Sequence, residues 1–340
     1  MTKRNLLAAG ALLAVAVTAG CGSGTSSTST ANTGTSKAAG AGRIALLLAV
    51  QANPASGAVT EGAKAEAAKE GAQLDVFDAG FDAQKQYSQM QDAITTGKYK
   101  GLLVQAVDGS SICSLVRQAT AAKIAVGAVN SAIGTDFTSA QSSCKGVATS
   151  VVRPFAVHGK ITGELTVRAC QQAKASPCEV GFLHVAPGAP FDKAILDGFQ
   201  SVIAGKDIKI VAEGNSQASR EGGFTVIQQM VTAHPKVAVI VGAEQSLLGG
   251  QAPIAASKLD HKVQLVGIGG STQGIAAVKD GSFFGLSYSA PRSEGSRAIT
   301  DLLRAITTGK PSPGVDVASH PDGGLIDSTN AAKFTPEFNA

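Results

Sequence analysis

The segment IALLLAVQANPASGAVTEGAKAEAAKEGAQLDVF, residues 44–77, contains one complete strand–helix–strand unit. Its apolar run Ile44–Val50 predicts a buried strand, and Leu74–Phe77 predicts a second strand. Between them, apolar residues at helical spacing predict a helix through Val59–Glu70 that ends at Gly71. Because the connection is a helix, we expect the two strands to be parallel neighbours in one sheet.

This alternation continues along the chain and restarts near residue 155. In the first half, further strands are predicted at 101–105 and 124–129, with helices at 84–96 and 110–122. In the second half, helices are predicted at 155–173, 191–203, 220–233, 245–258 and 272–279, with strands at 179–184, 208–212, 237–241 and 263–268. The pattern predicts an α/β protein with two doubly wound parallel-sheet lobes. A binding cleft is expected at the carboxyl ends of the strands.

The beginning of the chain has the pattern of an export signal. Positive residues, a short apolar stretch at 6–17 and three small residues lead directly into Cys21. The apolar stretch is too short to cross a membrane, and the small residues before the cysteine resemble a bacterial lipobox. We predict a lipoprotein signal peptide at 1–20 and lipidation of Cys21, with ordinary cleavage near Ala19 as the alternative. The Gly-, Ser-, Thr- and Ala-rich segment 21–42 is expected to be a flexible tether.

The remaining cysteines form an even set of four. They are Cys113, Cys144, Cys170 and Cys178, and they allow three disulfide pairings. We favour Cys113–Cys144 and Cys170–Cys178, because each pair brackets one candidate loop. A metal site is the alternative, but the sequence has neither a C-x-x-C spacing nor a flanking cluster of histidines. Disulfides agree with export to an oxidising compartment.

Composition and motifs argue against nucleic-acid binding and against catalysis. A net charge of +4 with 16% charged residues is too small and too dispersed for a nucleic-acid surface. The glycine-rich loop 267–274 has the wrong spacing for a dinucleotide fingerprint, and 214–218 lacks the second glycine of a nucleophile elbow. We therefore expect a protein that is not an enzyme and that needs no cofactor or metal.

Short motifs in a consistent order resemble those of the type I periplasmic binding proteins, specifically the ribose/galactose-binding group. The similarity extends from Arg43 to about Ser328. The motifs are Asn53-Pro54, Lys64-x-Glu66-Ala-x-Lys69-x-Gly71, Gly159-Lys160-Ile161-x-Gly163, Asp197-Gly198-Phe199, Thr232-Ala233-His234-Pro235, Val266-Gly267-Ile268 and Gly281 before the strand containing Leu286.

The resemblance implies two lobes joined by three crossings that close around a ligand. The crossings are expected near residues 151–153, 288–291 and 316–320. Lobe 1 would then comprise 43–152 with 289–317, and lobe 2 would comprise 153–288 with 318–340.

The resemblance also implies ligand-binding positions. Sugar recognition uses planar polar side chains for paired hydroxyls and an aromatic face for the C–H surface of the ring. Asn53, Asn130 and Arg220 occupy positions where the group carries ligand-contacting residues. For Asn53 the alternative is a capping role before Pro54, and for Arg220 a solvated helix end.

Several positions depart from the pattern of the group, so a ribose-like pocket is not predicted. The departures are Ala55, Ser56, Ser131, Ala243, Glu244, Gly269 and Ser289. Replacement ligand-binding residues are nominated from the cleft loops, helix starts and crossings: Phe81, Asp108, Arg153, Phe155, Phe191, Lys193, Glu244, Gln245, Tyr288 and Arg292. Packing between the lobes is the alternative role for the aromatic residues. His158 and His184 are interpreted as structural histidines.

These features predict an extracytoplasmic substrate-binding lipoprotein that captures a small polar solute, with a sugar or polyol favoured, and delivers it to the permease subunits of an ABC importer. The protein is expected to be monomeric and anchored by lipid to the outer face of the cytoplasmic membrane. The alternative is a receptor of the same fold that presents its ligand to a membrane sensor kinase or chemoreceptor. A transcriptional regulator is excluded, because an export signal takes the place of N-terminal DNA-binding helices.

Overall fold

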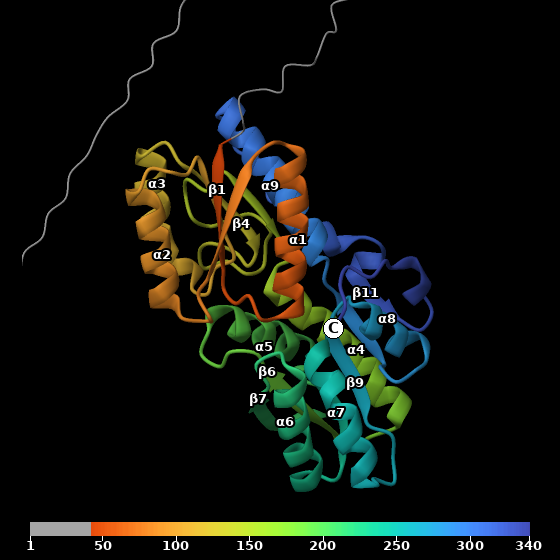
Figure 1. Ribbon diagram of the computed structural model, residues 1–340. Helices are drawn as coiled ribbons and strands as arrows, with labels where there is room; N and C mark the ends of the chain where they lie inside the picture. Colours follow the sequence, from red (N-terminus) through yellow and green to blue (C-terminus); the bar gives the residue numbers. More distant parts are fainter. Residues whose placement is uncertain (1–41) are drawn as a thin grey trace, which may run out of the picture. The chain divides into compact units, whose positions relative to one another are not determined.

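Two β-sheets form the framework of residues 42–340, the part of the chain that the computed structural model describes (Figure 1). The predicted signal peptide, Cys21 and the tether up to residue 41 lie outside the described residues. The predicted fold class is confirmed, since both sheets are built from alternating strands and helices and are almost entirely parallel.

Five parallel strands make the first sheet, in the order β2-β1-β3-β4-β5. They are β1 (Arg43–Leu48), β2 (Gln73–Asp78), β3 (Gly101–Val104), β4 (Ala125–Asn130) and β5 (Thr149–Val152), and the helices around them are α1 (Pro54–Lys69), α2 (Ala83–Thr95), α3 (Gly109–Ala121) and α9 (Pro291–Thr308). Leu46 shares a hydrophobic cluster with Val59 of α1 and Leu302 of α9. Leu47 shares the opposite cluster with Met90 of α2, because successive strand residues point to opposite faces. Both faces of this sheet are therefore covered.

Six strands make the second sheet, in the order β11-β10-β9-β8-β6-β7. They are β6 (Cys178–His184), β7 (Ile208–Asn215), β8 (Val237–Ala243), β9 (Gln264–Gly269), β10 (Gly285–Tyr288) and β11 (Leu325–Asp327), and β11 alone is antiparallel to its neighbour. The surrounding helices are α4 (Phe155–Ala173), α5 (Pro190–Ile203), α6 (Arg220–Ala233), α7 (Glu244–Ser257) and α8 (Thr272–Lys279). Leu165 of α4 and Phe199 of α5 pack on one face, and Leu247 of α7 packs on the other.

The chain passes between the two sheets at three places. The first follows β5 and leads into α4, and the second follows β10 and leads into α9. The third begins after Val315, which pairs with Val151 of β5, and it leads to β11 of the second sheet. Below, lobe 1 means the elements of the first sheet with α1, α2, α3 and α9, and lobe 2 means the elements of the second sheet with α4–α8.

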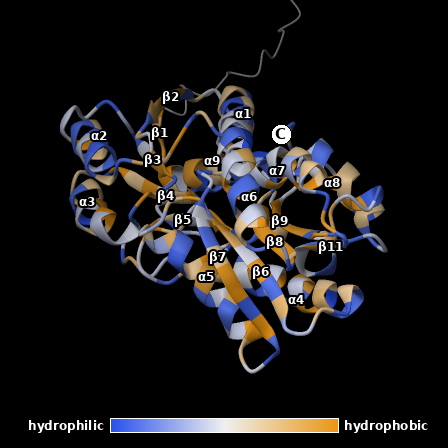
Figure 2. Ribbon diagram, turned by 90° about the horizontal axis from the view of Figure 1, so that it is seen from below, coloured by the Kyte–Doolittle hydropathy of each residue, from blue (hydrophilic) through white to orange (hydrophobic). Residues whose placement is uncertain are grey.

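Hydropathy follows this layered arrangement. In Figure 2 the central strands are predominantly hydrophobic, whereas the surrounding helices alternate hydrophilic and hydrophobic residues. Within residues 42–340, no helix combines the length and the apolar character that crossing a membrane requires.

Two helices differ from the sequence-based expectations. Helix α1 begins at Pro54, five residues before the predicted start, because the Asn53 side chain caps it and Pro54 occupies its first turn. Helix α9 was not assigned from the sequence, although Ala298, Ile299 and Leu302 form a buried stripe at helical spacing. This stripe packs on the first sheet, so α9 returns the chain to lobe 1 after β10.

Helices α1 and α9 cross in direct backbone contact at glycines. A Cβ atom on Gly62 would lie 2.0 Å from the Arg292 carbonyl oxygen, and one on Gly295 would lie 2.1 Å from the Val59 carbonyl oxygen. Because both obstructing atoms belong to the backbone, neither can move aside like a flexible side chain. The close contact therefore requires glycine at both positions.

We expect Gly62→Ala to lower the free energy of unfolding by about 1–3 kcal/mol, because overpacking forces the two helices apart. Gly57→Ala is the matched control in the same helix, since nothing lies within 4 Å of its Cβ position. The control should be neutral or stabilising by roughly 0.5–1 kcal/mol, because alanine favours the helix over glycine. Urea unfolding measures both values, and equal effects of the two substitutions would contradict the tight contact.

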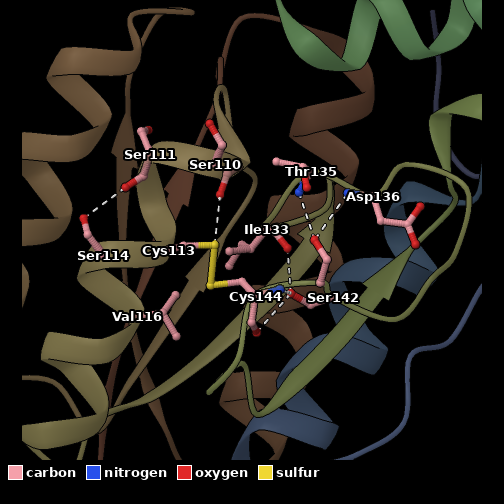
Figure 3. The surroundings of a disulfide bond; sticks show 12 residues. Ser110, Ser111, Cys113, Ser114, Val116, Ile133, Thr135, Asp136, Ser142 and Cys144 are labelled. Atoms are coloured by element: carbon pink, nitrogen blue, oxygen red, sulfur yellow. Dashed lines mark hydrogen bonds between the residues drawn. A yellow bond between two sulfur atoms is a disulfide. The ribbon is translucent and has the colours of Figure 1, made fainter.

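Both favoured disulfide pairings are confirmed. Cys113 of α3 is joined to Cys144, with Cα atoms 5.6 Å apart, and Cys170 of α4 is joined to Cys178 of β6, with Cα atoms 5.8 Å apart. Figure 3 shows the first bond between α3 and the irregular segment that follows β4. This bond limits the freedom of the long connection between β4 and β5.

Candidate functional site

A cavity of about 150 Å³ lies between the lobes, at the carboxyl ends of the parallel strands. This is about ten times the space of 10–15 Å³ that one enclosed water needs. Lobe 1 contributes residues at or directly after the ends of β1, β2, β3 and β4, and lobe 2 contributes residues at or directly after the ends of β6, β7, β8 and β9. The cavity therefore occupies the position predicted for the binding crevice of open parallel sheets.

Aromatic side chains from both lobes form one wall. Phe81 follows β2 in lobe 1, whereas Phe155 and Phe191 stand at the starts of α4 and α5. The Phe81 and Phe191 rings stack at 27° with centroids 6.4 Å apart, and the Phe155 and Phe191 centroids are 5.2 Å apart. The same rings thus line the cavity and pack between the lobes.

Amide side chains of lobe 1 form the polar wall. The Gln105 Nε2 group donates to the Asn130 Oδ1 atom at 2.8 Å, and the Gln105 Oε1 atom accepts from the Ala49 backbone N–H at 3.2 Å. The Asn130 Nδ2 group in turn donates to the Glu294 Oε2 atom of α9 at 2.7 Å. Asn130 has φ = 61°, a backbone conformation that asparagine tolerates better than most residues. This chain of hydrogen bonds orients the amides at the end of β3 and β4.

Glu294 is fully buried behind this wall. Burial raises its pKa to about 7, and the hydrogen bond from Asn130 opposes that rise. It belongs to a group of charged residues at the crossings that also contains Arg153 and Asp316. Arg153 is buried, donates to the Gly323 carbonyl oxygen at 2.8 Å, and lies 3.5 Å from the Asp316 carboxylate. Burial lowers the pKa of Arg153 and raises that of Asp316.

The cavity lining offers no unpaired charge. Its titratable members, within the described residues, are Asp192 and His158. The Asp192 carboxylate accepts a hydrogen bond from the Val185 backbone N–H at 2.8 Å and is hydrogen-bonded to the His184 Nδ1 atom at 2.6 Å. That hydrogen bond raises the pKa of His184 to about 9, with a further contribution from Glu213, so Asp192 faces a cationic partner at neutral pH. Burial lowers the pKa of His158, which is therefore neutral.

Six of the thirteen predicted ligand-binding residues line the cavity. They are Asn53, Phe81, Asn130, Phe155, Phe191 and Gln245. The Asn53 Oδ1 atom accepts from the Ala55 backbone N–H at 2.8 Å, so this side chain caps α1 at the edge of the cavity. Whether these residues contact a ligand remains a prediction.

The other seven, including Arg292 at the start of α9, lie outside the cavity lining. Asp108 caps α3, Lys193 is exposed and paired with Asp197, and Arg220 donates to the Ala340 carbonyl oxygen. Arg153 is buried at a crossing. Glu244 and Tyr288 are buried in lobe 2, and the Tyr288 hydroxyl donates to the Thr335 carbonyl oxygen. In this structure their side chains make capping, pairing and packing contacts.

Glu244 explains two of the departures from the family pattern. Its carboxylate accepts from the Ser271 backbone N–H at 3.2 Å and occupies the space beside Gly269 and Gly274. A Cβ atom on either glycine would lie within 2.1 Å of the Glu244 Oε2 atom. The small residue at 269 and the carboxylate at 244 therefore depend on each other.

Several lining residues were not nominated from the sequence. They are Gln105, Ser56, Ser131, Ser289, Phe182 and Phe338, and His158, interpreted as structural, also lines the cavity. Gln105 directly follows the apolar run of β3, so its place at a strand end was a usable signal. Phe338 carries no such signal, because it lies far from any of the cleft loops in sequence.

The pH dependence of stability can test the environment of Glu244. Burial raises its pKa from the ordinary 4.5 to about 7. Between these values the folded protein holds a proton that the unfolded chain has released, so stability falls by about 1.4 kcal/mol for each pH unit crossed. Above pH 7 this contribution is constant.

Glu244→Gln removes this loss while keeping an acceptor for Ser271. The melting temperature of the variant relative to the native protein should therefore rise between pH 5 and pH 8. The control is Glu221→Gln, which removes an exposed carboxylate from α6. A difference between Glu244→Gln and the native protein that stays the same at both pH values would contradict the raised pKa.

A cleft between two α/β lobes joined by three crossings defines a two-lobed binding protein. The family model described as the periplasmic binding protein domain matches residues 44–311, and the chain belongs to this family. Membership implies an extracytoplasmic protein.

Individual relatives agree with this assignment. The ribose import binding protein of Salmonella typhimurium strain LT2 is 28% identical over 259 residues, which cover 75% of this chain and 82% of the relative. A solute-binding protein of an ABC transporter from Mycobacterium smegmatis, solved with bound glycerol, has a TM-score of 0.73 at 25% identity, covering 88% of this chain and all of that one (100%). The Caulobacter myo-inositol-binding protein, bound to myo-inositol, is similar in fold, with a TM-score of 0.73 at 20% identity over 87% of this chain and 97% of that one.

Proposed function

We propose that this protein is an exported, lipid-anchored receptor that captures a neutral sugar or polyol by closure of its lobes and delivers it to an ABC importer. The observation that carries the proposal is the cavity between the lobes, whose walls combine amides, hydroxyls and aromatic rings without an unpaired charge. Amides match the paired hydroxyls of a sugar or polyol, and rings match its C–H surface. The relative named for ribose import and the solved structures with bound glycerol and myo-inositol support the same ligand class.

We also propose how the chain is divided between the two lobes. Lobe 1 would comprise 43–152 with 289–317, and lobe 2 would comprise 153–288 with 318–340. The membership of β1–β5 in one sheet and β6–β11 in the other supports this division. Closure would then bring Gln105 and Asn130 of lobe 1 toward Gln245 of lobe 2 around the solute.

Substitution of Gln245 is the most direct test of ligand contact. It is buried in the cavity wall, and among the described residues its side-chain amide has no hydrogen-bond partner within the protein. Gln245→Ala should therefore leave the melting temperature of the free protein nearly unchanged. Loss of one hydrogen bond to the ligand should weaken binding roughly threefold to tenfold.

The measurement is a thermal-shift screen of residues 42–340 against D-ribose, D-allose, myo-inositol and glycerol, followed by calorimetry of the solute with the largest shift. A ligand that binds only the folded state raises its stability by about 2.7 kcal/mol at a hundredfold excess over the dissociation constant. The control is Gln251→Ala in the same helix, outside the cavity lining. Equal affinities of the two variants would exclude contact by Gln245. Binding of charged solutes alone would refute the proposed ligand class.

Lipid anchoring is tested in cells with Cys21→Ser. The substitution removes the thiol that lipidation requires, so we expect the protein to move from the membrane fraction to the soluble exported fraction. Uptake of the solute identified above should fall with it. The control is Ser23→Ala, which changes a nearby residue and keeps the cysteine. Membrane retention of the Cys21→Ser protein would show that the cysteine is not the anchor.

A further inference from the structure

The segment Phe334–Ala340, called the strap below, is bound to lobe 2 by its backbone. The Glu337 N–H donates to the Gly270 carbonyl oxygen at 3.1 Å, and the Thr272 N–H donates to the Phe338 carbonyl oxygen at 2.9 Å. Ser271 and Phe338 pair in parallel, like neighbouring strand residues. The strap therefore lies along the loop between β9 and α8, next to Gly269 at the end of β9, which lines the cavity. Figure 1 marks the end of the chain where the two lobes meet.

The same segment is also bound to lobe 1, at the start of α9. The Ser293 N–H donates to the Glu337 Oε2 atom at 2.8 Å, and the Ser293 hydroxyl donates to the Glu337 Oε1 atom at 2.6 Å. The Arg292 Nε group donates to the Glu337 carbonyl oxygen at 3.2 Å. One residue of the strap thus holds the first turn of a lobe 1 helix.

The Glu337 carboxylate provides a side-chain acceptor for the first turn of α9. The N-cap residue of this helix, Ala290, has no side-chain acceptor for the free N–H groups of the first turn. The Glu337 carboxylate accepts from one of these groups, and its negative charge is favourable at the positive end of the helix. The interaction exists only while the lobe 2 loop and the lobe 1 helix are held at this separation.

Phe338, the next residue, enters the cavity wall. Its side chain is 8% exposed and lines the same cavity as Phe81, Phe155 and Phe191. Consecutive side chains of the strap thus contact different parts of the molecule, Glu337 the start of α9 and Phe338 the cavity. A side chain that lines the cavity is therefore adjacent in sequence to the side chain that joins the lobes.

We propose that the strap is part of the ligand site: Phe338 provides an apolar face for the C–H surface of a ring-shaped neutral solute, and Glu337 positions it by capping α9 across the cleft. This proposal rests on the proposed function and extends it. Ring-shaped solutes are favoured because a flat phenyl ring covers a sugar or inositol ring better than a linear polyol such as glycerol.

The chain contains no tryptophan, so Phe338→Trp introduces a single fluorescent reporter. Phe224→Trp is the matched control, because Phe224 is the exposed large hydrophobic residue of α6. In proportion to exposed fractions of 8% and 43%, acrylamide should quench the reporter at position 338 about fivefold less than the control reporter at position 224. Equal quenching of the two reporters would overturn the placement of residue 338 in the cavity wall.

The positioning role is tested in the Phe338→Trp background. Adding Glu337→Ala removes the cap on α9, and we expect the quenching of the reporter to rise. Lys333→Ala is the control, because Lys333 is an exposed residue near the strap that pairs with Asp322 within lobe 2. Equal quenching in the two double variants would show that Glu337 does not hold Phe338. Neither comparison needs a ligand.

Phe338→Ala tests ligand contact, with myo-inositol, D-ribose and glycerol as probes. The affinity for the ring-shaped probe that binds the native protein should fall roughly tenfold, the loss expected for one aromatic contact. The affinity for glycerol should change less. An unchanged affinity for a ring-shaped probe that the native protein does bind would refute the role of Phe338 and leave the proposed function intact. Failure of every neutral sugar and polyol to bind the native protein would instead refute the proposed function.

Discussion

The hydrogen bond between Asn130 and Glu294 joins a side chain of the cavity wall to the start of α9, directly after a crossing. A buried carboxyl group is costly unless it is protonated or hydrogen-bonded, and Glu294 is fully buried with a pKa raised to about 7. Its partner Asn130 comes from the end of β4 and also accepts from Gln105. The polar wall of the cavity is thus oriented by a group that belongs to α9. A shift of this helix would therefore displace the Asn130 and Gln105 amides that face the cavity.

Helix α9 has a second role, since three separate parts of the chain meet at its first two turns. Gly295 allows the backbone of α1 to approach, Glu294 bonds to Asn130, and Ser293 bonds to Glu337 of the strap. Two of these contacts lie within lobe 1, and the third reaches lobe 2. The start of α9, directly after a crossing, is therefore the point at which the relative position of the lobes is coupled to the geometry of the cavity.

The neutrality of the cavity results from pairing as well as composition. Asp192 lines the cavity, but its carboxylate is hydrogen-bonded to His184, whose pKa is raised to about 9. Glu244, close behind Gly269, is buried, with its carboxylate against the Ser271 backbone N–H. The carboxylates near the cleft are thus hydrogen-bonded to a histidine or to backbone N–H groups of loops. Selectivity is left to amides, hydroxyls and rings, which suits an uncharged solute.

Strand and helix periodicity in the sequence predicted the two-lobed α/β fold and the cleft at the strand ends, because these follow from local apolar patterns. Residues that directly follow strands, such as Phe81 and Asn130, could be placed near the cavity for the same reason. Cysteine spacing favoured the two observed disulfides among three possible pairings. Charge and residue type could not show that Arg220 and Lys193 lie outside the lining, since that depends on where each helix start points. Phe338 and Glu337 were missed because they reach the cleft only through pairing with the β9–α8 loop, a contact between segments about 66 residues apart. Local patterns determine which elements form, whereas contacts between distant segments determine which side chains share the cavity.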